Sequence, residues 1–497
     1  MKSNTFAANL VADQAKQARK ENVTTTTNGA KAFKSTLNAN VDLHAKLGSA
    51  RQLSEAAIIS TFDAALKEDS DIALRNMLML RDVRGGMGER NAFRICLKHL
   101  YDTNYNVLIN SNLLSKVPEV GRWDDLLVFF DKAYNKEIKQ KITAIIKQGL
   151  DDKNGLLAKW LPRQGPVAAE LRYFLGWTPK FYRKTIVGLT NVVETTMCKG
   201  KPSFKEINFN HVPSRAMQIY KKAFSLNAVD EFKAWREALV NGTGDAKINA
   251  GAVFPHQVLN EVVKGTNEMS PVFEKQWDAL PNYIADGVNI LPMIDVSGSM
   301  DTPAVEGYSC MDIAIALGMY AATKMSGDFN DCYLTFSERP IIAKLHGKSL
   351  KEKVNNVRRE HVGYNTNVNA AFLKIVEFAK THKISHADMP KFLVLFSDMQ
   401  FDVADRTDGN KTGFAMAKAA FKDAGYDLPK IVFWNLNANV KNQPVKFDKN
   451  GTALVSGFSP ALMKSIFSAE LDADDFTPLA LMLKALQVER YNINYGV

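Results

Sequence analysis

The spacing of apolar residues divides this chain into two parts. From about residue 52 to residue 264, apolar residues recur every three or four positions, as in Leu74, Met77, Leu78 and Leu80, which is typical of helices with one buried face. Beyond residue 288, short apolar runs of strand length alternate with helical stretches. The sequence therefore predicts an all-α part followed by an α/β part.

The all-α part consists of helices joined by short turns, for example over residues 138–150, 166–175 and 179–194. Paired helices of this kind indicate HEAT-like helical repeats, although no sharp sequence period is visible. The first 44 residues are rich in Asn, Thr, Lys and Ala with weak periodicity, which predicts a flexible arm. We expect this arm over residues 1–44 and the helical repeat domain over residues 45–286.

The α/β part begins with an apolar run that ends abruptly at Asp295. A short, bounded run predicts a buried strand rather than a helix. Further strands are predicted by later runs, with helices between most of them, over residues 331–337, 340–345, 391–398 and 430–436 and beyond residue 452. This alternation is typical of a doubly wound α/β domain, which we expect over residues 287–497.

Oxygen-bearing side chains follow the ends of these predicted strands. Asp295, Ser297 and Ser299 follow the first strand, Asp398 ends a later one, and Thr366 lies in a polar loop before a helix. Open α/β sheets bind ligands at the carboxyl ends of their strands. Hydroxyl and carboxylate oxygens are the ligands that Mg²⁺ prefers, so we expect Mg²⁺ or Mn²⁺ at these five residues. The alternative is that Asp295 and Ser297 only cap a turn.

The net charge of +10 lies entirely in residues 1–290, and residues 159–222 hold twelve Lys and Arg against three Glu. Such a basic segment, with aromatic residues interleaved, indicates nucleic acid as a partner. The alternative is a solvated surface with surplus lysines. The residues expected to face phosphates are Arg163, Arg172, Lys180, Arg183, Lys184, Arg215, Lys221 and Lys222.

A glycine-rich segment at residues 81–90 is a second candidate for contact with nucleic acid. It lacks the Gly-Lys-Ser/Thr ending of a phosphate-binding loop and follows a helix rather than a strand, so neither nucleotide-binding motif fits. A tight turn between two helices is one interpretation. The other is that its arginines, Arg84 and Arg90 among them, bind a nucleic-acid backbone.

Several classes of protein are disfavoured by the sequence. The four cysteines are scattered without a C-x-x-C pair, which indicates reduced thiols in a cytoplasmic protein. No apolar run reaches the length of a membrane span, and no signal peptide is visible, so we expect no membrane partner. No Ser/His/Asp or Cys/His arrangement falls at the expected ligand edge, which favours a protein that is not an enzyme.

The local motifs resemble those of an uncharacterised family of two-part proteins. The similarity is carried by residues 293–300, 396–402, 431–436 and 455–459 in the α/β part and by residues 81–86, 121–127, 182–184 and 212–217 in the helical part. The architecture of that family is similar to the Ro (TROVE) ribonucleoproteins, in which helical repeats are followed by a von Willebrand factor A domain. The resemblance implies binding of single-stranded RNA ends or of small structured RNA.

The spacing of the oxygen ligands also resembles the metal-ion-dependent adhesion site of von Willebrand factor A domains. That resemblance implies that Ser297, Ser299 and Thr366 bind the metal directly, that Asp295 and Asp398 often act through water, and that a partner's carboxylate completes the shell. A second function therefore stays open. The protein would then be an adaptor without RNA, serving an AAA+ ATPase or a phage virion and using the metal site for protein contacts.

Overall fold

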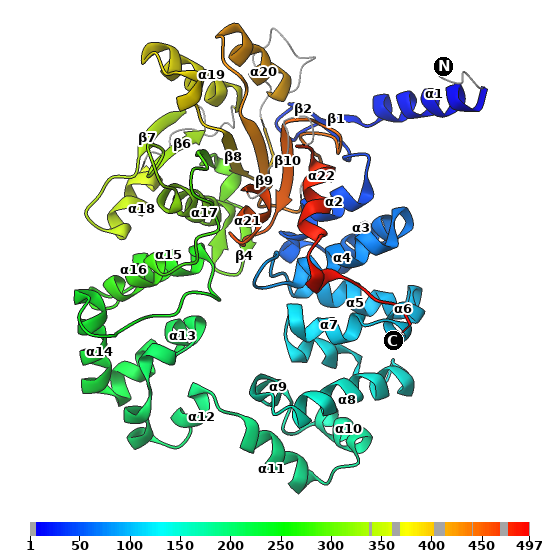
Figure 1. Ribbon diagram of the computed structural model, residues 1–497, viewed down its shortest axis with the longest axis vertical. Coiled ribbons are helices and arrows are strands. Elements are labelled where there is room, and N and C mark those ends of the chain that lie inside the picture. Colours follow the sequence, from blue (N-terminus) through cyan, green and yellow to red (C-terminus); the bar gives the residue numbers. More distant parts are fainter. Residues whose placement is uncertain are drawn as a thin grey trace. The chain divides into compact units, whose positions relative to one another are not determined.

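The computed structural model describes residues 6–336, 340–359, 368–401, 413–439, 441–467 and 476–496 (Figure 1). The chain packs into two compact units, and each of them is discontinuous in sequence. Unit 1 comprises residues 1–76 and 282–486, and unit 2 comprises residues 77–281 and 487–497. Unit 2 is therefore an insertion within unit 1 to which the C-terminal segment returns.

Unit 1 is built on a six-stranded sheet with the order β10-β9-β8-β3-β6-β7. Neighbouring strands are parallel except for β6 and β7, which are antiparallel. The strands are β3 (Ile290–Asp295), β6 (Cys332–Phe336), β7 (Ile341–Lys344), β8 (Phe392–Ser397), β9 (Lys430–Asn435) and β10 (Thr452–Ser456). Later strands are added on both sides of β3, so β3 lies at the point where the strand order reverses. The predicted α/β sheet is confirmed.

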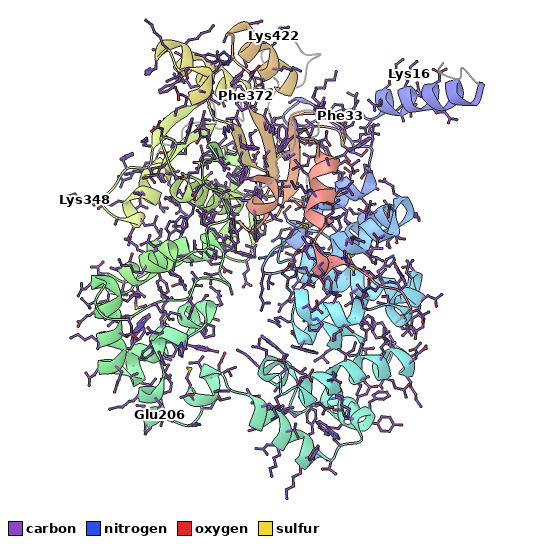
Figure 2. The ribbon with its side chains drawn as sticks, in the orientation of Figure 1. Lys16, Phe33, Glu206, Lys348, Phe372 and Lys422 are labelled. Carbon is purple, nitrogen blue, oxygen red and sulfur yellow. The ribbon has the colours of Figure 1, made fainter. Side chains whose placement is uncertain are left out.

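Helices of unit 1 cover this sheet. The largely apolar α17 (Cys310–Lys324) packs against β3, β6 and β8 and is buried along most of its length. The amphipathic α19 (Val368–Thr381) packs against β6 and β7, and Phe372 on its buried face is marked in Figure 2. The remaining helices after β7 are α18 (Leu350–Arg359), α20 (Gly413–Asp423), α21 (Leu462–Phe467) and α22 (Pro478–Leu486).

Residues 6–44, within the expected arm, form helices and a hairpin that belong to unit 1. After α1 (Phe6–Glu21), β1 (Val23–Thr25) and β2 (Lys31–Phe33) form a hairpin, and Phe33 pairs through its backbone with Gln443. The following α2 (Ala39–Leu47) packs against β10 and against α3 (Glu55–Glu68). Most of its apolar residues are buried, and the first segment of unit 1 extends to residue 76, beyond the arm expected over residues 1–44.

The approach of α2 to β10 is unusually close. The Gly48 N–H donates to Ser456 Oγ at 3.0 Å, and the Ser456 hydroxyl donates to the His44 carbonyl at 2.7 Å. A Cβ at position 48 would lie 2.2 Å from the Ser456 carbonyl oxygen, so only glycine fits there. This contact joins residues separated by 408 positions in the chain.

Unit 2 is helical, as predicted. Helix α4 (Ser70–Arg81) carries the chain into it, and the helices pack mainly against near neighbours in sequence, such as α8 with α10 and α9 with α11. Its α-helices are α5 (Asn91–Thr103), α6 (Tyr105–Asn110), α7 (Leu113–Val120), α8 (Lys136–Asp151), α9 (Gly155–Trp160), α10 (Pro166–Leu175), α11 (Pro179–Leu189), α12 (Val193–Met197), α13 (Ser214–Asn227), α14 (Val229–Asn241), α15 (Pro255–Lys264) and α16 (Ser270–Asp278), with 3₁₀ helices η2 (Trp123–Phe129) and η3 (Lys201–Glu206) between them.

The helices of unit 2 differ from the expectation at one point. The helix predicted over residues 179–194 is interrupted after Leu189, and a new helix, α12, begins at Val193. No helix in the described ranges is both long and apolar enough to cross a membrane.

Candidate functional site

The predicted metal ligands of unit 1 lie at the carboxyl ends of the neighbouring strands β3 and β8. Asp295 and Ser297 are fully buried, Asp398 is buried, and Ser299 is half-buried. The Ser297 N–H donates to Asp295 Oδ1 at 3.0 Å, and the Ser397 hydroxyl donates to Asp295 Oδ2 at 2.6 Å. The hydroxyl oxygens of Ser297 and Ser299 are 3.2 Å apart. Four of the five predicted ligands are thus gathered at one edge of the sheet.

The electrostatics of this cluster suit a cation. Burial and the nearby charge of Asp398 raise the pKa of Asp295 to about 7, and burial likewise raises the pKa of Asp398. Ligands at about 2.1 Å from Mg²⁺ in an octahedral shell are roughly 3 Å apart, close to the separation of the two serine oxygens. Two buried carboxylates beside two hydroxyls form a hard-oxygen set that fits Mg²⁺.

The set is incomplete within the residues that the structure describes. Thr366, the fifth predicted ligand, lies outside them. In the described ranges no three His, Cys, Asp or Glu side chains are grouped as metal ligands, so a metal here would depend on the serine hydroxyls. The loop after Asp398 is held by the N-terminal turn, because the side chain of Asn28 donates to the Gln400 carbonyl at 2.9 Å and the Thr27 N–H donates to Gln400 Oε1 at 2.8 Å.

The glycine-rich segment of unit 2 forms a tight turn against the end of α4. The Met87 N–H donates to the Met79 carbonyl and the Glu89 N–H to the Leu80 carbonyl, and a Cβ at Gly86 would lie 2.1 Å from the Met79 oxygen. The backbone of this segment is therefore a tight turn, which is the first of the two interpretations offered by the sequence. Arg84 and Arg90 are both exposed on it.

Two other arginines near this turn are neutralised by carboxylates. Asp125 is fully buried and accepts from Arg81 Nε at 2.8 Å, from Arg94 Nε at 2.6 Å and from the Arg122 N–H at 2.9 Å. Arg94 also pairs with Asp124 at 2.9 Å. These arginines hold the core of unit 2 together and are engaged within it.

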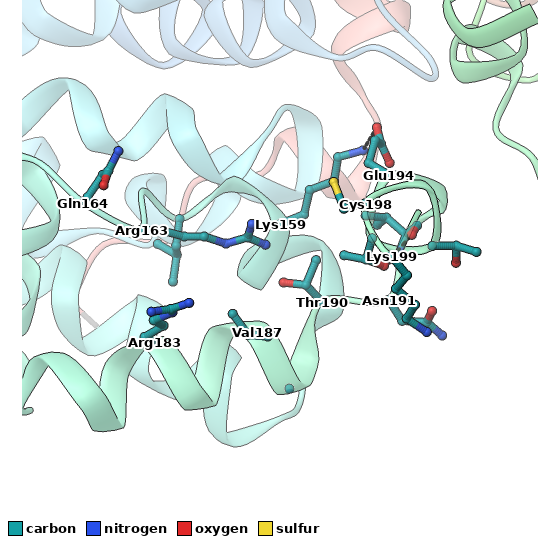
Figure 3. Close-up of a pocket in the computed structure, with 15 residues that line it drawn as sticks. Lys159, Arg163, Gln164, Arg183, Val187, Thr190, Asn191, Glu194, Cys198 and Lys199 are labelled. Atoms are coloured by element: carbon teal, nitrogen blue, oxygen red, sulfur yellow. Dashed lines mark hydrogen bonds and ion pairs between the residues drawn. The ribbon is translucent and has the colours of Figure 1, made fainter. Parts of the chain in front are cut away.

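A cavity of about 1400 Å³ lies between the end of α9, helix α11 and helix α12 (Figure 3). It exists because the chain leaves helical geometry at Thr190–Val192, which separates α11 from α12. Arg163 and Arg183 lie on one side of it, and Glu194, Cys198 and Lys199 on the other. Two of the predicted nucleic-acid residues therefore meet at this cavity.

Glu194 is the acidic residue of the cavity wall. Its Oε1 accepts from Lys159 Nζ at 3.0 Å and from the Tyr220 hydroxyl at 3.3 Å. Its Oε2 is buried and has no hydrogen-bond partner within the described part of the chain. Burial alone raises the pKa of Glu194, but hydrogen bonds and the charge of Lys159 outweigh it and lower the pKa, so the side chain is ionised at neutral pH.

Exposed cations lie at the cavity and along helix α11, which forms one of its walls. Arg163, Lys180, Arg183, Lys184 and Lys199, which we call the basic face, are all exposed. Across the ranges described, none of these five has a carboxylate partner. Phe181 is 52% exposed and contacts the edge of Trp177 at 4.9 Å between ring centres, whereas its neighbour Tyr182 is buried. The basic face therefore combines unpaired charge with an accessible ring.

The other predicted phosphate contacts are engaged elsewhere or lie apart. Arg172 stacks on the Tyr182 ring at 5.9 Å, and Arg215 donates to Gln218 at 2.5 Å. Lys221 forms an ion pair with Glu261, and Lys222 beside it on α13 is exposed. Nothing in the sequence singles out Lys159, Lys199 or Glu194 as site residues, and only the break in the predicted helix brings Glu194 to the cavity.

The fold and the two sites define a class of two-unit proteins, in which a helical unit is inserted into an α/β unit. Residues 26–162 and 173–288 match the family described as Domain of unknown function (DUF2828), and residues 289–485 match that described as Domain of unknown function (DUF7788). Because the first match covers about half of the chain, the protein belongs to the DUF2828 family. The two matched regions meet close to the boundary predicted at residues 286 and 287.

Similar proteins are found in a virus and among solved structures. "Uncharacterized protein L728" of Acanthamoeba polyphaga mimivirus is 29% identical, over 94% of this chain and 87% of that protein. The crystal structure of the Deinococcus radiodurans Ro (RSR) protein matches with a TM-score of 0.36 and 13% identity, over 88% of this chain and 93% of that chain. Proximal thread matrix protein 1 of the mussel byssus matches with a TM-score of 0.25 and 13% identity, over 39% of this chain and 48% of that chain.

Proposed function

We propose that this protein is a non-enzymatic RNA-binding scaffold of the Ro-like ribonucleoprotein kind, acting in the cytoplasm. The observation that carries the proposal is the basic face beside the 1400 Å³ cavity, where exposed cations without carboxylate partners adjoin the exposed Phe181 ring. Single-stranded nucleic acid is held by this combination, since phosphates bind the cations and bases stack on aromatic rings. The cavity is larger than most small-molecule sites, which favours a polymer segment over a metabolite.

Salt dependence of RNA binding tests this proposal. If each of the five cations of the basic face meets one phosphate, log affinity for single-stranded RNA falls against log salt with a slope of about −3.5. Arg183→Ala with Lys184→Ala removes two contacts and makes the slope shallower by about 1.4. The measurement is fluorescence anisotropy of a labelled single-stranded RNA with the full chain. Absence of binding at low salt would refute the RNA function.

A matched control removes equal charge elsewhere in unit 2. Lys233 on α14 and Lys247 in the loop after it are exposed, and α14 packs against α13 and α16 rather than against the helices of the cavity. Lys233→Ala with Lys247→Ala should leave the slope within error of the unaltered chain. Phe181→Ala should weaken binding by about 1–3 kcal/mol without changing the slope, because stacking releases no counterions.

We further propose that unit 1 has a von Willebrand factor A-like fold and that the helices of unit 2 form HEAT-like repeats. In unit 1, Mg²⁺ or Mn²⁺ would bind at Asp295, Ser297, Ser299, Asp398 and Thr366. The paired buried carboxylates and the adjacent serine hydroxyls support the metal site. A bound Mg²⁺ would supply positive charge for a partner's carboxylate. The residues of the chain would fix the position of that ion.

The same cluster favours a second candidate function, that of an adaptor which binds an acidic protein through the metal site and uses no RNA. Among the residues that the structure describes, the half-buried Ser299 beside the buried Asp295 and Asp398 gives such a partner access to the cluster. Purification at low salt distinguishes the two functions. Nuclease-sensitive absorbance at 260 nm that co-purifies with the chain supports the scaffold, and a chelator-sensitive protein partner without RNA supports the adaptor.

A further inference from the structure

The cavity of unit 2 contains one group that phosphate binding leaves unused, the buried Oε2 atom of Glu194. Phosphates carry no hydrogen-bond donor at neutral pH, and a carboxylate repels them. Buried acceptors in folded proteins nearly always have a partner, so a buried acceptor without one, on a side chain that lines a cavity, points to a donor from a ligand or from water. The ligand that the basic face attracts is therefore expected to carry a donor to this point.

The position of Glu194 is fixed before any ligand arrives. Lys159 Nζ at 3.0 Å and the Tyr220 hydroxyl at 3.3 Å both bind its Oε1, from helices α9 and α13 on either side. These two contacts fill Oε1 and hold the carboxylate in one orientation. Oε2 remains to accept, so the site can take a hydrogen-bond donor from a ligand.

Nucleobases differ in what they offer to such an acceptor. Cytosine, adenine and guanine carry an exocyclic amino group, which donates freely to a carboxylate. Uracil has no exocyclic amino group, and its single edge donor, N3–H, lies between two carbonyl oxygens that face a carboxylate unfavourably. Bases of single-stranded RNA are unpaired and can be splayed out, so their edges are available to side chains.

We infer that Glu194 selects, within single-stranded RNA bound at the basic face, a base that carries an exocyclic amino group over uracil. The inference rests on the proposed RNA binding and adds base selectivity to it. Arg163, Arg183 and Lys199 hold phosphates at the rim of the cavity, and the base between them enters to donate to Glu194 Oε2.

Cytosine and uracil provide the sharpest comparison, because the two pyrimidines are similar in size and differ at one edge by an amino group and a carbonyl. The full chain should bind oligocytidine roughly five- to tenfold more tightly than oligouridine of equal length, with equal salt slopes. Glu194→Gln keeps the shape and an acceptor for Lys159 but places an amide donor at the cavity. This variant should bind both oligomers equally or prefer oligouridine.

Glu206→Gln is the matched control, because Glu206 is exposed on η3 and does not line the cavity (Figure 2). It removes the same charge and should keep the preference for oligocytidine. Equal binding of both oligomers by the unaltered chain, or an unchanged preference in Glu194→Gln, would overturn the role of Glu194 while leaving RNA binding in place. Absence of binding to either oligomer would overturn both.

Cys198 supplies a second readout that does not depend on affinity. This cysteine is exposed and lines the cavity, whereas Cys96 and Cys310 are buried. Saturating oligocytidine should slow alkylation of Cys198 several-fold. The rate of alkylation is measured on the full chain by mass spectrometry. An unchanged rate under saturating RNA would place the bound base outside this cavity and would refute the assignment.

Discussion

Replacing Asp125 by Asn tests whether the arginines of the glycine-rich segment belong to the core of unit 2. Asp125 is 0% exposed, and Arg81, which binds its Oδ2, is 2% exposed. An asparagine has one acceptor and one donor at its tip. The best orientation keeps the oxygen toward Arg81 and the Arg122 N–H and turns the amide N–H₂ toward Arg94, which still has Asp124.

The cost of this change follows from the charge that remains. In Asp125→Asn the buried guanidinium of Arg81 loses its counter-charge, and removal of one partner from a buried pair costs about 3–5 kcal/mol. Unit 2 has roughly 200 residues, for which 1 kcal/mol corresponds to about 2–4 °C in Tm. We therefore expect the Tm of unit 2 to fall by about 6–20 °C.

Tryptophan fluorescence during thermal unfolding of the full chain measures this loss, because five of the six tryptophans lie in unit 2. The control is Asp102→Asn, which removes the same charge from an exposed position on α5 and should change the free energy of unfolding by less than about 0.5 kcal/mol. A Tm for Asp125→Asn equal to that of the control would show that Arg81 is not held by this carboxylate, and the account of the segment would fail.

Three further predictions concern unit 1. Mg²⁺ at 100 times its Kd should stabilise the unaltered chain by about 2.7 kcal/mol, and Asp295→Asn should abolish this gain. The assay is thermal unfolding with Mg²⁺ and with a chelator. Equal stabilisation of the unaltered chain and of the variant by Mg²⁺ would contradict the metal site. Gly48→Ala should destabilise unit 1 by at least about 1–3 kcal/mol in denaturant unfolding, because the new Cβ would overlap the Ser456 carbonyl. A change no larger than that of Gly251→Ala, at an exposed glycine with open space around it, would argue against the close packing. Burial raises the pKa of Asp42 to about 6, although hydrogen bonds from Thr36 lower it. The folded state therefore keeps a proton that the unfolded state releases near pH 4. Folding stability is lost as the pH rises from 4 to 6. Asp42→Asn should therefore gain about 2–3 kcal/mol over the unaltered chain between pH 4 and pH 7, and a difference in unfolding free energy that does not vary with pH would refute the reasoning.

The sequence predicted the sheet of unit 1 well because its strands are apolar runs bounded by polar residues, which is a local signal. The gathering of Asp295, Ser297, Ser299 and Asp398 followed from the same signal, since the carboxyl ends of parallel strands share one edge. The docking of α2 on β10 carries no such signal. The pattern of α2 indicates an apolar face but does not say which of the strands, some 400 residues away, covers it.

Charge and helix periodicity were weaker guides in unit 2. Arg81 and Arg94 are neutralised by an acidic residue 44 and 31 positions away, whereas Arg163 and Arg183 stay exposed. A count of arginines in the sequence cannot distinguish these two pairs. Phe181 and Tyr182 look alike in sequence, yet only one is buried. The break at Thr190 was not predicted because helix propensity is a small preference that tertiary packing overrides, and with it the role of Glu194 was missed.

The contact between α2 and β10 has a consequence for the synthesis of this protein. Residue 48 leaves the ribosome long before residue 456, and at about 5–20 residues per second the 408 residues between them take roughly 20–80 s to translate. Throughout that time Val41, Leu43 and Leu47, all buried in the finished fold, have no strand to cover them, while unit 2 is completed in between. The nascent chain thus carries α2 with its neighbour α3 but without strand β10 for most of its synthesis, which makes α2 a segment that a chaperone could protect.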